Sequence, residues 1–120
     1  METTPQFLPA YGSHDEFSAR IERSETIVFN ALLMPDTATQ HYGARAVMVS
    51  RGDGGQHWLR VCEGADERWM RWTEQRRLRM QFGATYAEAL AQAWITRWER
   101  DGWKVEWSQR NAAPPEAVAA

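Results

Sequence analysis

The sequence is poor in cysteine, histidine and lysine. Cys62 is the only cysteine, so the chain can form no internal disulfide. The three histidines, His14, His41 and His57, stand far apart, and none has a second histidine or a cysteine at the spacing of a metal site. We therefore expect no bound metal and no other cofactor.

Signatures of enzymes and of membrane segments are also missing. There is no Gly-x-Ser-x-Gly turn and no phosphate-binding Gly-Lys loop. No apolar run reaches the roughly 18 residues of a membrane-spanning helix, and no apolar leader follows Met1. The sequence thus favours a cytoplasmic protein that is not an enzyme and has no membrane partner. An enzyme whose site is assembled from scattered groups, such as Asp53 and His57, is the alternative.

The remaining composition is that of one globular domain. The chain has 120 residues, of which 43% are apolar and 25% charged, and both fractions are ordinary for a folded protein. Residues 1–12 contain two prolines and no hydrophobic period, so we expect a flexible arm there. We expect a single α+β domain over 13–107 and a disordered tail over 108–120, where Pro114-Pro115 lies.

Two helices are predicted from their start signals. Ser13 and Glu16 match a capping box, which predicts a short helix near 14–23. Thr85 and Glu88 match a second box before the longest apolar stripe in the chain, which Asp101-Gly102 ends. Helical spacing places on that stripe Ala87, Leu90, Ala91, Trp94, Ile95 and Trp98.

Several short strands are predicted around these helices. Residues 25–34 are apolar enough for a strand buried on both faces. Alternating patterns between turn signals predict further strands over 44–51, 56–63, 68–73, 77–82 and 103–107. In the last two, Leu78, Met80 and Phe82 should point inward, and Trp103, Val105 and Trp107 should share a face. We expect a small antiparallel sheet of four to six strands with the long C-terminal helix packed on one face. The short N-terminal helix completes the expected fold.

Arginine and tryptophan are the abundant residues that could recognise a partner. The chain has seven tryptophans, and residues 68–79 carry five arginines against the single acid Glu74. Strand alternation predicts an Arg/Trp face turned away from the long helix, where a partner could bind. The candidate contact residues on this face are Trp58, Arg60, Trp69, Arg71, Arg77 and Arg79.

Such a face is most typical of protein recognition, because Trp and Arg dominate binding hot spots. We therefore expect a small adaptor or inhibitor, of the kind that mobile elements or phages carry. Nucleic-acid binding by the same face is an alternative, although the net charge of −2 disfavours binding driven by bulk charge. A purely solvated face, with indole rings stacked under guanidinium groups, is another. The acidic N-terminal third, including Asp15 and Glu22, would also permit homo-oligomers.

One family resemblance keeps the nucleic-acid alternative open. The run from Gly55-Gln56-His57-Trp58 through Arg71-Trp72 and Phe82 to Asp101-Gly102-Trp103 resembles the WGR domain. The resemblance implies a small sheet crossed by a helix and a part in nucleic-acid-dependent signalling. The defining Trp-Gly-Arg is replaced here by Trp72-Thr73-Glu74.

Overall fold

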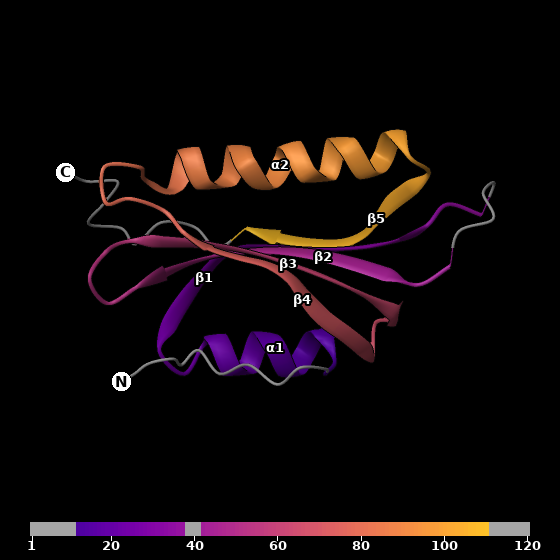
Figure 1. Ribbon diagram of the computed structural model, residues 1–120, viewed down its shortest axis with the longest axis horizontal. Helices are drawn as coiled ribbons and strands as arrows, with labels where there is room; N and C mark the ends of the chain where they lie inside the picture. The colour runs from indigo at the N-terminus through magenta and orange to yellow at the C-terminus, as the bar shows by residue number, and fades with distance from the viewer. Residues whose placement is uncertain (1–11, 38–41, 111–120) are drawn as a thin grey trace.

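A five-stranded antiparallel sheet forms the middle layer of the molecule, with one helix on each face (Figure 1). The computed structural model describes residues 12–37 and 42–110. The elements in chain order are α1 (His14–Ile21), β1 (Glu25–Pro35), β2 (Ala44–Gly52), β3 (His57–Asp66), β4 (Trp69–Arg77), α2 (Ala84–Arg100) and β5 (Trp103–Arg110). This arrangement confirms the expected α+β fold. The arm expected over 1–11, His41 and residues 111–120 lie outside the described residues.

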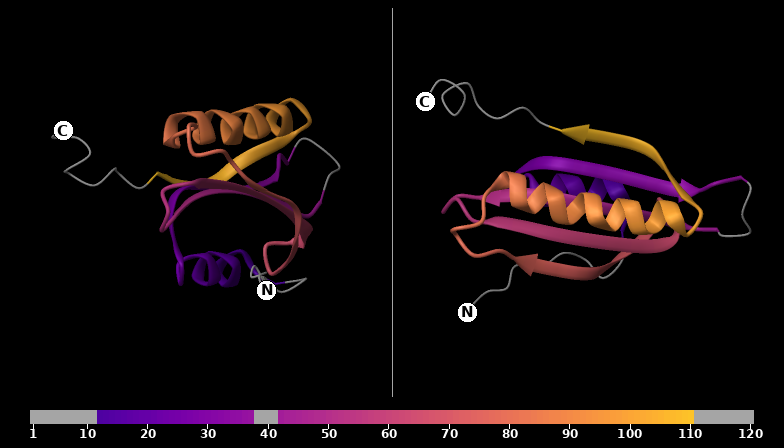
Figure 2. Two further views of the ribbon diagram at one scale, coloured as in Figure 1. Left: turned by 60° about the vertical axis from the view of Figure 1, so that its left-hand side comes forward. Right: turned by 90° about the horizontal axis from the view of Figure 1, so that it is seen from above.

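The strand order is β4-β3-β2-β1-β5. Strands β1 to β4 follow one another as neighbours, and α2 then carries the chain back across the sheet, so that β5 pairs with β1. Figure 2 shows this crossing from above, with β4 at one edge of the sheet and β5 at the other. The segment richest in arginine therefore forms an edge strand.

The two helices begin differently. The Ser13 hydroxyl accepts from the Glu16 amide at 3.0 Å, and the Glu16 carboxylate accepts from the Ser13 amide at 2.7 Å, which confirms the capping box of α1. The box expected at Thr85 and Glu88 is wrong. Helix α2 begins at Ala84 after the cap residue Gly83, which makes no side-chain cap hydrogen bond, and Glu88 instead pairs with Arg110.

Both faces of the sheet are buried, each under its own helix. Under α2 lies a cluster that includes Phe29, Val47 and Trp98, and α1 covers a second cluster that includes Phe17 and Met70. Full burial of such a side chain contributes roughly 1.5–3 kcal/mol. The face opposite the long helix is therefore largely a second core layer, and only its margins are open to a partner.

Register shifts change which side chains share a face. Strands 68–73 and 77–82 were expected to be separate, but one strand, β4, spans 69–77, with Thr73 as an extra residue at a bulge. Leu78 is buried as expected, whereas the chain turns over 79–82, and the side chain of Met80 is 63% exposed instead of pointing inward.

Strand β5 also differs from the prediction. Residues 108–110 pair with 29–31 of β1, so these three residues belong to the sheet and not to the tail expected from 108. A bulge leaves Glu106 as an extra residue, because Trp107 pairs with Leu32 and Val105 pairs with the next residue, Leu33. Trp103 and Val105 pack toward α2 as expected, but the bulge turns Trp107 to the α1 side.

Candidate functional site

Three of the six predicted contact residues, Trp69, Arg71 and Arg77, lie in the edge strand β4, and Arg79 follows its end. The side chain of Trp69 is 62% exposed, and Arg71, Arg77 and Arg79 are exposed as well. Among the described residues these three arginines make no ion pair, whereas Arg76 lies 3.7 Å from Glu74. The edge is therefore positively charged, and the described part of the chain neutralises this charge only partly.

The predicted residues do not share a single face. Arg77 pairs with Trp58, on the side of the sheet that α1 covers. Because of the Thr73 bulge, Met70 and Trp72 also lie on the α1 side, so alternation places Trp69 and Arg71 on the α2 side. Arg79 lies beyond the end of β4, in the turn that leads to α2. The arginines thus flank the strand edge on both sides.

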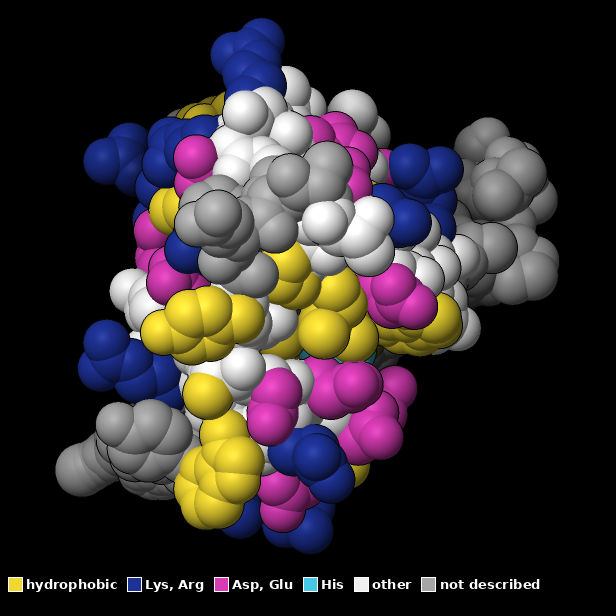
Figure 3. Space-filling model, turned by 90° about the vertical axis from the view of Figure 1, so that its right-hand side faces the viewer, with side chains coloured by type: hydrophobic (Ala, Val, Ile, Leu, Met, Phe, Trp, Pro, Cys, Tyr) yellow, Lys and Arg dark blue, Asp and Glu magenta, His cyan; other side chains and the backbone are white. Residues whose placement is uncertain are grey.

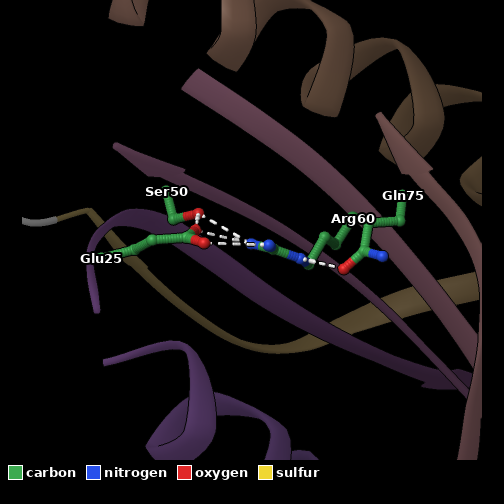
Figure 4. Close-up of polar contacts among 4 residues, drawn as sticks. All are labelled: Glu25, Ser50, Arg60 and Gln75. Carbon is green, nitrogen blue, oxygen red and sulfur yellow. Dashed lines mark hydrogen bonds and ion pairs between the residues drawn. The ribbon is translucent and has the colours of Figure 1, made fainter. Parts of the chain in front are cut away.

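Arg60 is not a surface residue, and the expectation that a partner could contact it is wrong. Its side chain lies on the α1 side of the sheet, and the residue is only 4% exposed. The guanidinium donates to both carboxylate oxygens of Glu25, at 2.7 and 3.0 Å, to the Ser50 hydroxyl at 3.0 Å, and to the Gln75 side-chain oxygen at 2.7 Å (Figure 4). It also stacks 4.8 Å from the centre of the Trp58 ring.

This buried network fixes the position of the β4 edge. Glu25, Ser50, Arg60 and Gln75 come from β1, β2, β3 and β4, and the Ser50 hydroxyl also donates to Glu25. Charge-assisted, bidentate pairs are stronger and more directional than neutral hydrogen bonds. Slipping β4 along β3 would separate Gln75 from Arg60, so the network specifies the register that places Arg77 on the α1 side.

The backbone of β4 is paired on its outer side at one position only among the described residues. There the Gly12 amide donates to the Met70 carbonyl at 2.9 Å, and the Met70 amide donates back at 2.8 Å. No further backbone bond to the outer side of residues 71–77 occurs within the described ranges. An edge strand directs alternate N–H and C=O groups away from its sheet. Among the described residues, the outward backbone groups of β4 beyond Met70 therefore have no backbone partner.

Two of the groups considered for chemistry, Cys62 and His57, are buried in β3. Cys62 is buried, and burial, with a smaller contribution from Glu63, raises the pKa of its thiol far above the ordinary value. Burial, followed by the charge of Arg51, lowers the pKa of His57, so its neutral form is favoured. Among the described residues, no group of three His, Cys, Asp or Glu side chains could hold a metal. In the same ranges no helix is long and apolar enough to cross a membrane.

A cavity of about 600 Å³ between α1, β1 and β5 has no counterpart in the predicted site. Its lining includes His14, Asn30 and Trp107. The sequence pattern predicts the opposite face for Trp107, because nothing in the residue types marks the extra residue Glu106. A bulge is visible only when the pairing partners are known.

Comparison with protein-family models, with curated proteins and with solved structures finds no match to this chain, and the likeness to the WGR domain gains no support from it.

Proposed function

We propose that the protein is a non-catalytic binding module that docks an extended, acidic segment of a partner protein along the outer edge of β4. One observation supports this most directly: an edge strand whose outward backbone has no backbone partner over 71–77 among the described residues is flanked on both faces by exposed arginines. The buried thiol and the absence of a metal cluster among the described residues give no comparable support to a catalytic role.

Strand addition explains why both faces carry arginine. A partner strand that pairs with β4 gains affinity from backbone hydrogen bonds, and its side chains alternate between the two faces. Arg77 would meet acidic side chains on the α1 side, and Arg71 would meet them on the α2 side. Trp69, near the start of the strand, offers an aromatic anchor of the kind that dominates hot spots.

The same arginines select against the wrong partner. Edge strands readily pair with other copies of themselves, and charged side chains on the edge prevent this. Two β4 edges of like charge repel, whereas an acidic strand is attracted. By binding such a segment, the protein would serve as an adaptor or as an inhibitor. Its single free cysteine suits the cytoplasm, where thiols stay reduced.

The test compares charge-reversed edges in affinity capture. The double variant Arg71→Glu/Arg77→Glu should lose about tenfold or more of the captured partner, since two attractive contacts become repulsive. Arg23→Glu, an exposed reversal in the turn after α1, is the matched control and should capture normally. Thermal unfolding of all three proteins should agree, because none of these arginines is buried.

Nuclease treatment and salt separate the two classes of ligand. Capture of the same protein partner with and without nuclease, and its confirmation with the purified partner, supports the proposal. Loss of capture after nuclease, with affinity for oligonucleotides that falls steeply between about 50 and 200 mM salt, identifies a nucleic-acid ligand and overturns it. Undiminished capture by the double variant removes β4 as the site.

A further inference from the structure

The cavity between α1, β1 and β5 is built from parts that suit a small cation. Its volume of about 600 Å³ lies within the range of small-molecule sites. Ile27 and Leu32 contribute apolar lining, while Trp107 contributes an indole that is 41% exposed. Figure 3 shows the end of the molecule at the right of Figure 1, where apolar side chains form a band with acidic side chains directly beneath it. Apolar and acidic groups are thus close neighbours on this part of the surface.

A closed set of hydrogen bonds holds the polar part of the lining. His14 is 7% exposed, and its Nε2 lies 2.9 Å from the Asn30 side-chain oxygen. Asn30 donates to the Ser18 hydroxyl at 3.2 Å, which in turn donates to the His14 carbonyl at 3.0 Å.

The charge of the lining has one sign. Asp15, Glu22, Glu67 and Glu106 line the cavity, and no Lys or Arg among the described residues does. Carboxylates that surround a partly enclosed, apolar space concentrate cations there. The face of Trp107 attracts a cation further, and its ring meets the His14 ring edge-on, at 5.6 Å between centres. The β5 bulge at Glu106 is what brings this indole to the α1 side.

We propose that this cavity binds a small organic cation, an alkylammonium or alkylguanidinium group with an apolar stem. The head group donates hydrogen bonds to the carboxylates and lies against the face of Trp107, and the stem lies against Ile27 and Leu32. Such a group can come from a free amine or from a basic side chain. The site is separate from the β4 edge, so its test does not depend on the proposed function.

The test uses a matched pair of probes. Butylguanidinium and butylurea have nearly the same shape, but only the first is charged. In a titration followed by NMR, butylguanidinium should shift the His14 and Trp107 ring resonances at concentrations at least tenfold below those that butylurea needs. Binding should weaken when salt rises from about 50 to 200 mM. Blocked arginine amide, titrated in parallel, distinguishes the two sources. Tighter binding of blocked arginine amide indicates a protein side chain, and tighter binding of butylguanidinium indicates a free cation.

Variants locate the site. Glu67→Gln/Glu106→Gln removes two carboxylates from the lining and should weaken butylguanidinium binding about threefold or more. Trp107→Leu should weaken it as well, since the cation loses its aromatic wall. Asp53→Asn, an exposed acid in the turn between β2 and β3, is the control and should bind normally. Circular dichroism establishes that each variant is folded. Equal binding of both probes, or unchanged binding by the folded carboxylate double variant, overturns the proposal.

Discussion

The side chain of Arg60 forms an ion pair in the interior of the molecule. A charged group in an alternating strand is expected on the surface, and charged residues are almost never fully buried unless paired. Here Glu25 supplies that pair from 35 positions earlier in the chain. Stacking of indole and guanidinium, one of the alternatives considered from the sequence, does occur, with Arg60 over Trp58 and Arg97 over Trp94.

The ion pair makes a prediction about stability. Glu25→Leu leaves the Arg60 charge buried without a counter-ion and should cost about 3–5 kcal/mol in the free energy of unfolding. The double variant Glu25→Leu/Arg60→Met removes both charges and should recover much of that loss. Urea denaturation of the two variants measures both values. A cost below about 1 kcal/mol for the single variant would show that solvent screens Arg60 despite its burial.

At the scale of the elements, the sequence predicts well which helices and strands form, but it predicts poorly which face of the sheet each side chain occupies. The spacing of apolar residues locates the helices and most strands, and Gly102, with φ +97°, ends α2 as expected. The predicted face is wrong wherever a bulge intervenes, because one extra residue moves every later side chain in the strand to the opposite face. Thr73 separates Arg71 from Arg77 in this way, and Glu106 separates Trp107 from Val105. The sequence therefore predicts one Arg/Trp face, whereas the structure divides these residues between the two sides of the β4 edge.

The start of α2 gives a second prediction. Gly83 caps the helix with extended backbone (φ −95°) and no side-chain acceptor, and a Cβ there would meet nothing within 4 Å. Gly83→Asp supplies an acceptor for the first amides and restrains the unfolded chain, so it should raise the free energy of unfolding by about 0.5–1 kcal/mol. Gly83→Ala adds the Cβ without the acceptor and should give no gain. Urea midpoints compare the two, and equal midpoints would exclude a capping effect.

At the scale of the whole molecule, the sequence implies two apolar helix faces but does not say where each lies. The stripe on α2 requires a sheet beneath it, which the strands provide. Nothing in residues 14–23 indicates that α1 covers the opposite face, because that placement depends on contacts such as Phe17 with Trp72, far away in the chain. The sheet is thus enclosed on both sides, and its candidate binding groups are displaced to edges and margins.

Cys62 can report on the opening of this enclosed structure. The thiol lies in the cluster beneath α1 and is fully buried, so a thiol reagent reaches it only when the layers separate. Alkylation by iodoacetamide at neutral pH should be at least about a thousandfold slower in buffer than in denaturant, and its rate should rise along the same urea transition as tryptophan fluorescence. A rate that is fast and independent of urea at low concentration would mean that α1 detaches by itself.

The bulge in β5 has a consequence for how this molecule can evolve. Since Glu106 is an additional residue, the layer that Trp107 joins is decided by its pairing with Leu32 and not by its spacing from Val105. Deleting Glu106 would restore strict alternation and leave the indole opposite Leu32, on the α1 side. Loss of the bulge would therefore preserve the aromatic wall of the cavity and remove one carboxylate from its lining, so the two features can change independently in evolution.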